Sequence, residues 1–168
     1  MSITLTNIAN KLKRRGVKLI GIRSDMVTVL CVCGKVQKGD LNRVLLSRRC
    51  VFCNCGRSEA LTRKIYEGIT QKEFVNCRPS WLNGLELDGY NEELQMAFEY
   101  NGIQHYKYMP GFFHKKGIKT FNDQLRRDKL KEKICSDRGI QLHVIPYVFN
   151  YTNETKLREF IQTKISGK

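Results

Sequence analysis

The sequence predicts a mixed α/β domain with a central sheet, preceded by a small cysteine-rich module. Helical and strand-like patterns alternate from residue 58 onward, with two strands in succession near the middle. Two close pairs of cysteines lie before this region, and the first third of the chain is strongly basic. A chain of 168 residues has room for a stapled module and one compact domain, and we expect these to span residues 1–56 and 57–168.

The first module is expected to begin with a short helix over residues 6–15, where Ile8 and Leu12 share one face. Two short β-rich segments follow, over residues 17–22 and 27–31. Ser24 and Asp25 lie between them and predict a turn.

Hydrophobic periodicity in the second region predicts six elements that build a mixed sheet with flanking helices. They are a helix over 58–67, strands over 84–90 and 94–100, a helix over 123–138, a strand over 140–145 and a helix over 154–165. Gly68 and Gly139 are expected to end helices, Asn122 to cap one, and Asn91-Glu92 to turn between the two adjacent strands. Residues 107–120 are rich in glycine, lysine and aromatic residues and predict a loop.

The clustered cysteines predict a structural zinc site. Two pairs separated by 16 residues place four thiolates on two tight turns, as tetrahedral Zn²⁺ requires. Gly34 relieves the backbone after the first pair, and Cys55 is an alternative to the last ligand. A module of the zinc-ribbon or treble-clef type is expected. Its predicted ligands are Cys31, Cys33, Cys50 and Cys53.

The net charge of +14 favours a polyanionic partner, because each phosphate contact releases condensed counterions. Residues 1–58 carry a net charge of +10 and the remainder carries +4. No basic amphipathic helix of the membrane type follows, so nucleic acid is preferred to anionic lipid. The sequence shows neither a membrane-spanning apolar run nor a signal peptide, so we expect a soluble, intracellular protein without a membrane partner. The expected phosphate contacts are Lys35, Lys38, Arg43, Arg48, Arg49 and Arg57.

Two carboxylates on the adjacent strands predict a catalytic metal site. Asp88 ends the first strand, and Glu99 lies in an apolar strand, where a lone carboxylate is costly to desolvate. Two such groups can share one hard divalent cation, and His105 is placed for proton transfer. Asp128 lies in a very basic helix and Glu59 near a helix start, where a salt bridge or the helix dipole also explains a carboxylate.

These motifs resemble those of a known nuclease group. The stretches FEYNGIQHY, RRDKLKEKIC and IQLHVIPY resemble the very-short-patch-repair-like branch of the restriction-endonuclease fold. They are most similar to small zinc-binding endonuclease-like proteins of phages, large DNA viruses and mobile elements, some of them homing endonucleases. The resemblance covers about residues 57–147 and implies a restriction-endonuclease-like central mixed sheet flanked by helices.

The resemblance implies an active site whose Asp88 and Glu99 bind Mg²⁺ and whose His105 activates water or assists the leaving oxygen. Glu59 and Asp128 would orient His105 or hold a second hydrated ion. The sequence departs from the fold's usual pattern, because Asn101 stands where a lysine normally follows the second acid. Either Lys107 or Lys129 would supply the missing cation, or His105 would make it unnecessary. The implied catalytic residues are Glu59, Asp88, Glu99, His105 and Asp128.

The function expected is Mg²⁺-dependent hydrolysis of phosphodiester bonds in DNA. One chain has room for one such site, so we expect one strand to be cut per event and a homodimer to be required for a concerted double-strand cut. A non-catalytic nucleic-acid-binding protein and a nuclease acting on RNA or branched DNA are the alternatives. A virus-encoded protein of this kind would work in the cytoplasm or nucleus of its host.

Overall fold

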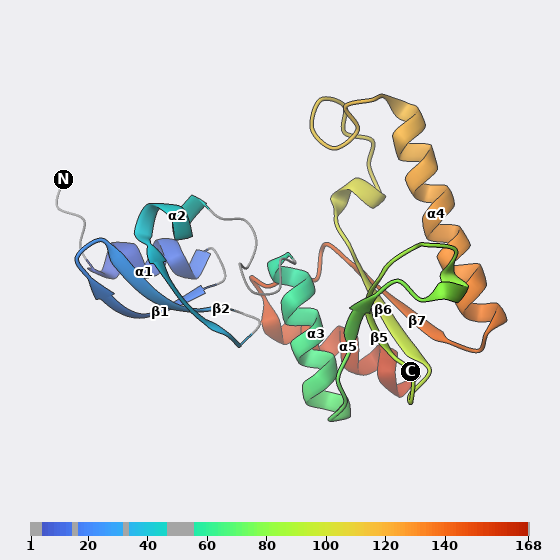
Figure 1. The fold of residues 1–168 in the computed structure, drawn as a ribbon, viewed down its shortest axis with the longest axis horizontal. Helices are drawn as coiled ribbons and strands as arrows, with labels where there is room; N and C mark the ends of the chain where they lie inside the picture. The colour runs from blue at the N-terminus through green and yellow to red at the C-terminus, as the bar shows by residue number, and fades with distance from the viewer. Residues whose placement is uncertain (1–4, 15–16, 32–33, 47–55, 168) are drawn as a thin grey trace. The chain divides into compact units, whose positions relative to one another are not determined.

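The structure is a computed structural model of a mixed α/β protein with two sheets (Figure 1). It describes residues 5–14, 17–31, 34–46 and 56–167. One compact unit comprises residues 1–65 and 150–159, and the other comprises 66–149 and 160–168. Helices α3 (Arg57–Thr70) and α5 (Glu154–Ser166) contribute residues to both units. The mixed α/β class is confirmed, and the boundary between residues 56 and 57 stays a prediction.

The first unit contains a three-stranded antiparallel sheet. Helix α1 (Leu5–Arg14) precedes strands β1 (Val17–Arg23), β2 (Met26–Cys31) and β3 (Val36–Asp40), and helix α2 (Leu41–Leu46) follows. The predicted helix and the first two strands are confirmed, as is their turn at Ser24 and Asp25. Strand β3 was not predicted, because Val36 is the one apolar residue in its sequence VQKGD. The buried apolar core of this unit consists of Ile8, Leu12, Val17, Val27, Val29 and Val44.

The second unit is built on a mixed four-stranded sheet in the order β4-β5-β6-β7. Its strands are β4 (Val75–Cys77), β5 (Leu87–Asn91), β6 (Met96–Asn101) and β7 (Gln141–Pro146). Strand β5 pairs antiparallel with both β4 and β6, whereas β7 runs parallel to β6, with Glu99 opposite Val144. Strand β4 was missed because it has three residues, too few for a periodic pattern.

The hairpin between β5 and β6 turns later than expected. Residues 92–95 form the turn, so Leu94 lies in it and is exposed, and its expected place in the strand is wrong. The Asn91 side chain fixes this turn, since its Oδ1 accepts the Leu94 amide at 2.7 Å. Asparagine is favoured at such positions because its side chain imitates a backbone turn.

Helix α4 (Ile118–Asp137) makes the crossover connection that the parallel pairing of β6 and β7 requires. The expected cap at Asn122 is wrong, because the helix begins directly after Gly117, whose φ is +92°. At the other end Gly139 has φ +72°, and Ile140 donates to the Cys135 carbonyl at 2.9 Å. This glycine-assisted ending is the one predicted.

Glycine proved to be an unreliable stop signal in α3. The helix passes through Gly68 and ends at Thr70, so the expected stop at Gly68 is wrong. Gln71, with φ +55°, takes the left-handed conformation instead and donates its amide to the Glu67 carbonyl at 2.9 Å. The last helix, α5, lies where it was predicted, with Leu157 and Ile161 buried.

The two faces of β6 pack against different helices, as Figure 1 shows for α3 and α4. On one face the Phe98 ring stacks on Tyr66 of α3 at 4.8 Å between centroids. Gly89 makes this possible, because a Cβ there would lie 2.1 Å from the Phe98 ring. On the other face Ala97 packs in a cluster with Cys135 of α4. Glu99 shares the Ala97 face, so it points toward α4.

None of the helices in the described part of the chain is both long enough and apolar enough to span a bilayer.

Candidate active site

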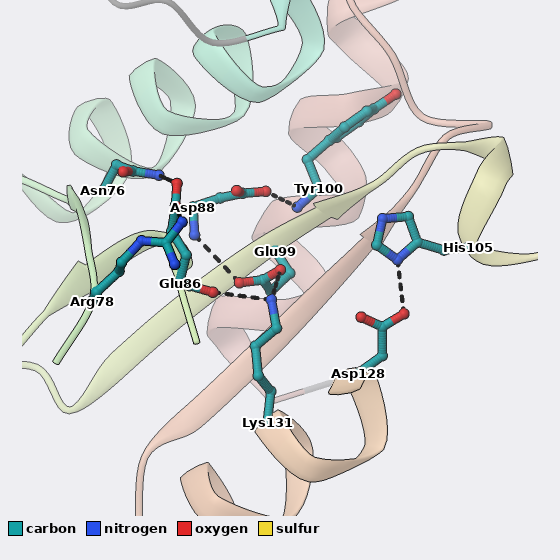
Figure 2. A network of polar contacts seen from close by, with 9 residues as sticks. All are labelled: Asn76, Arg78, Glu86, Asp88, Glu99, Tyr100, His105, Asp128 and Lys131. Atoms are coloured by element: carbon teal, nitrogen blue, oxygen red, sulfur yellow. Dashed lines mark hydrogen bonds and ion pairs between the residues drawn. The ribbon is translucent and has the colours of Figure 1, made fainter. Parts of the chain in front are cut away.

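The two predicted metal ligands lie side by side on neighbouring strands of the second unit. Asp88 and Glu99 continue the register in which Gly89 pairs with Phe98. The Asp88 amide donates to Glu99 Oε1 at 3.3 Å, and the Tyr100 amide donates to Asp88 Oδ2 at 2.8 Å. Each carboxylate is therefore held by the backbone of the opposite strand, as Figure 2 shows.

Lys131 supplies the cation that the sequence pattern lacked. Its ammonium group, carried by α4, makes an ion pair and hydrogen bond with Glu99 Oε2. The Lys131 side chain is 12% exposed and that of Glu99 is 9% exposed, so the pair is largely withdrawn from water. The sequence alternatives, Lys107 and Lys129, are both exposed.

The local electrostatics favour a positive charge beside Glu99. Burial, and then the charge of Asp88, raise the pKa of Glu99 to about 7, while Lys131 acts in the opposite direction. Two neighbouring carboxylates in a dry site repel each other unless a cation lies near both. The Lys131 ammonium relieves this repulsion at Glu99.

A second group holds Lys131 in place. The Lys131 ammonium also donates to the Glu86 carbonyl at 3.0 Å. The Glu86 side chain accepts from Asn76 Nδ2 at 2.8 Å and from Arg78 at 2.5 Å (Figure 2). Glu86, which directly precedes β5, thus fixes the lysine through its backbone carbonyl, and its side chain is tied to Asn76 of β4 and to Arg78.

The other two predicted residues of this unit also meet. His105 Nδ1 lies 2.8 Å from Asp128 Oδ2, and the two side chains are 17% and 19% exposed. His105 ends the short 3₁₀ segment η2 (Ile103–His105), which follows β6 directly, and Asp128 lies on α4. An imidazole bound at Nδ1 by a carboxylate presents Nε2 as its second, reactive nitrogen.

A small pocket connects the two pairs. Glu99, Asn101, Asp128 and Lys131 all line it, together with Glu132, Leu142 and Val144. Asn101, at the end of β6, is buried and hydrogen-bonds to the Tyr106 side chain. Glu99 and Lys131 of one pair and Asp128 of the other therefore border the same space.

The donor set suits a hard divalent cation. Mg²⁺ is commonly held by one or two carboxylates, with waters and substrate phosphates completing its octahedron. Asp88 and Glu99 provide two such carboxylates. Within the ranges that the structure describes, no group of three or more metal-binding side chains occurs. A bound Mg²⁺ would therefore depend on water and substrate for its remaining ligands.

The fifth predicted catalytic residue, Glu59, belongs to the first unit, in the first turn of α3. Its Oε2 accepts the Gly56 amide at 3.3 Å, and its Oε1 lies 3.4 Å from Arg63. Glu59 thus accepts a hydrogen bond from a backbone amide at the N-terminus of its own helix, which is the ordinary role of a carboxylate in the first turn.

The predicted zinc site lies mostly outside the described residues, since only Cys31 of its four ligands falls within them. Cys31 is buried at the end of β2. Its amide donates to the Lys35 carbonyl and its carbonyl accepts the Gly34 amide, each at 2.9 Å. Gly34 has φ +83°, a left-handed conformation that glycine adopts without strain. Cys33, Cys50, Cys53 and the alternative Cys55 fall outside the described residues.

The predicted phosphate contacts of the first unit differ in accessibility. Lys35, Lys38 and Arg43 are exposed, whereas Arg57 is buried at the start of α3. Arg48 and Arg49 lie outside the described residues.

Lys131 is the residue that sequence reasoning missed. It is one of five basic residues between positions 126 and 133, and nothing in the sequence distinguishes it from its neighbours. The one sequence feature that could have pointed to Lys131 is its spacing from Asp128, because residues three positions apart share a helix face.

Parts of the chain are similar to viral proteins. Uncharacterized protein 307L of Invertebrate iridescent virus 6 is 43% identical over 85 residues, which cover 44% of this chain and 42% of that protein. Uncharacterized protein 094L of Frog virus 3 (isolate Goorha) is 41% identical over 87 residues, covering 52% and 54% respectively. Uncharacterized protein 033L of Invertebrate iridescent virus 3 is 33% identical over 103 residues, covering 58% and 52%.

No protein-family model matches the chain, and no solved structure matches it. The chain spans about half the length of the curated viral relatives that it matches.

Proposed function

We propose that this protein is a metal-dependent DNA endonuclease that hydrolyses phosphodiester bonds, one strand per active site. The observation that carries the proposal is the buried cluster in which Glu99 lies between Asp88 and Lys131. A pair of carboxylates with a lysine and a carboxylate-bound histidine provides the groups that phosphate ester hydrolysis requires.

The proposed fold is that of the restriction endonucleases. A mixed sheet supports it, with α3 on one face, α4 on the other and the acidic residues on its two central strands. The proposed zinc module would precede this domain and be held together by Zn²⁺ in place of an extensive core.

In the proposed reaction Asp88 and Glu99 would hold Mg²⁺, which supplies polarisation of the phosphate and a lowered pKa for its water. His105 would take a proton from the attacking water or return one to the leaving oxygen, through Nε2. Asp128 would hold His105 by its Nδ1 and stabilise the imidazolium that forms. The Lys131 ammonium would offset the negative charge that develops on the phosphate.

DNA is the proposed substrate because the chain carries a net charge of +14 and exposes lysines in both units. Cleavage of linear duplex DNA, branched DNA and RNA, with and without Mg²⁺, tests the proposal. We expect Mg²⁺-dependent products with DNA and none with the Glu99→Gln variant. Equal cleavage by the wild-type protein and this variant would reject the assigned site, and cleavage of RNA alone would reject the substrate.

The alternative of a non-catalytic nucleic-acid-binding protein makes a different prediction in the same assay. Such a protein would bind the nucleic acids and cleave none of them under any metal. The burial of Glu99 beside a second carboxylate argues against this alternative, because it has a desolvation cost that simple binding does not require.

A further inference from the structure

The loop that follows His105, residues 106–117, exposes aromatic side chains. Tyr106 is 50% exposed, Phe112 is 55% exposed and Phe113 is 46% exposed. Phenylalanine is usually buried, so two adjacent exposed rings on a loop indicate an interaction surface. The two rings lie edge to face, 4.7 Å apart between centroids.

The loop has an anchor that keeps these rings outside. His114 is 2% exposed and its Nδ1 accepts the Met109 amide at 2.9 Å. Its ring packs on Tyr108 and Phe121 at 5.5 and 5.0 Å. One histidine therefore fixes the base of the loop, while its neighbour Phe113 is left in solvent.

The charged side chains of the loop itself and of its sequence neighbours are all basic. The sequence has no Asp or Glu from Tyr100 to Asn122. In the same stretch Lys107, Lys115, Lys116 and Lys119 are all exposed. The partner must therefore be an anion that also offers flat or apolar faces.

Unpaired nucleotides meet both requirements. In a duplex the base faces are already stacked, so lysines alone would be enough to bind its phosphates. Single strands present free base faces, and aromatic side chains with basic neighbours are the usual means of binding them. The loop also begins beside the candidate site, since Tyr106 follows His105 and its side chain hydrogen-bonds to Asn101.

We infer that residues 106–117 bind unpaired nucleotides of DNA by stacking on Phe112 and Phe113. The substrate of the candidate site is then DNA that contains a single-stranded segment beside the cleaved bond. The substrate assignment rests on the proposed function, whereas the binding role of the loop does not.

The test measures binding of the full-length chain, without added Mg²⁺, to a short oligothymidylate and to a duplex. Replacing Phe112 and Phe113 together by Ala should weaken single-strand binding about tenfold or more, because each stacked base contributes on the order of 1–3 kcal/mol. Duplex binding should change less than twofold. The double variant Val75→Ala with Leu94→Ala, which alters two other exposed apolar residues of the same unit, should bind both as the wild type does.

A second pair of variants separates stacking from simple hydrophobic contact. Phe112→Leu with Phe113→Leu keeps apolar side chains but removes the flat rings, so single-strand binding should fall nearly as far as with Ala. Phe113→Trp should retain binding, and its fluorescence should be quenched when the oligonucleotide is added.

Three results would overturn the inference. Equal weakening for duplex and single strand would show that the loop does not distinguish them. Full binding by the Leu variants would exclude stacking. Loss of binding to phosphatidylserine vesicles in the Ala variant, without any change for DNA, would assign the loop to membranes. Single-strand binding by a protein that cleaves nothing would preserve the role of the loop and reject the nuclease.

Discussion

His105 Nδ1 lies 2.8 Å from Asp128 Oδ2, although the two residues are 23 positions apart in the chain. One follows the end of β6 and the other lies on the crossover helix α4. Both side chains are more than four-fifths buried, so the contact is better protected from solvent than a surface ion pair. The carboxylate fixes both the orientation of the ring and the nitrogen that remains for chemistry.

His105→Ala should lower the cleavage rate by about 10²- to 10⁴-fold, the usual contribution of a positioned acid or base. Metal affinity should persist, because the metal is assigned to Asp88 and Glu99. Asp128→Asn should lower the cleavage rate by a smaller factor. The double variant with His105→Ala and Asp128→Asn should cut no more slowly than His105→Ala alone, since the two side chains act as one unit. Single-turnover cleavage and Mn²⁺ titration provide the measurements, and additive losses would contradict the pairing.

Glu99→Gln should abolish cleavage and leave DNA binding unchanged or slightly stronger. The substitution keeps the size of the side chain but removes the charge that is proposed to hold Mg²⁺ and that also repels phosphate. Glu92→Gln, in the exposed β5–β6 turn, is the control and should behave as the wild type does. A folded Glu99→Gln protein that cuts at the wild-type rate would show that the catalytic site lies elsewhere.

Lys131→Met should reduce cleavage by about 10²- to 10³-fold, because it removes a positive group from the site of developing charge. It should also destabilise the protein more at about pH 8 than at about pH 5.5, since Glu99 is ionised only above its raised pKa of about 7. Lys129→Met, on the exposed side of the same helix, should change neither property. Thermal unfolding at the two pH values is the readout, and an equal loss of Tm at both would argue against a charge interaction with Glu99.

His143 should contribute a loss of stability as the pH falls below about 6.5, whereas the raised pKa of Glu99 acts in the opposite direction. Burial, followed by the charge of Lys164, lowers the pKa of His143 from its usual value of 6.5. Above that value both the folded and unfolded chains carry a neutral imidazole, so the full stability is present. Below it the unfolded chain takes up a proton that the folded chain resists, and stability is lost until the folded pKa is reached.

His143→Asn should remove this contribution, so that on lowering the pH from about 6.5 to about 5 the variant loses less free energy of unfolding, or gains more, than the wild type does. Asparagine retains a polar atom for the Tyr66 hydroxyl, which lies 2.9 Å from His143 Nδ1. Urea unfolding across this range measures the slope. A slope as steep as that of the wild type would assign the acid sensitivity to other groups.

The chain should bind about one Zn²⁺ through Cys31, Cys33, Cys50 and Cys53. Metal analysis of protein purified without chelator should find it, and Cys50→Ser should lower both the zinc content and the stability of the first unit. Cys77→Ser, which alters a cysteine distant in sequence from the cluster, is the control. Zinc-free protein, or disulfides in a reduced preparation, would contradict the assignment.

Much of the second unit is predictable because its strands and helices carry clear periodicity. Side chains alternate between the two faces of β6, so Phe98 packs on Tyr66 of α3 while Glu99 meets Lys131 of α4. Helix ends were less predictable, because α3 continues through Gly68 and α4 begins ahead of Asn122. In both cases another residue with a positive φ lies at the actual helix end: Gln71 directly after α3 and Gly117 directly before α4.

The site residues that lie on adjacent strands could be predicted from the sequence. The site residue that a long connection brings to them could not. Asp88 and Glu99 lie on adjacent strands whose pairing follows from the short turn between them. Lys131 reaches Glu99 only because α4 returns across the sheet, a contact across 32 positions that no local pattern encodes. The lysine that pairs with Glu99 could therefore be identified only from the three-dimensional structure.

Helix α4 also limits how this protein can change during evolution. Asp128 and Lys131 lie three positions apart on one face, and an inserted residue between them would rotate one by about 100° away from the other. Substitutions at the exposed Lys129 and Leu130 leave that spacing intact. Substitutions are therefore tolerable in this part of the helix. The insertion or deletion of a single residue is not, because it would separate Asp128 from Lys131.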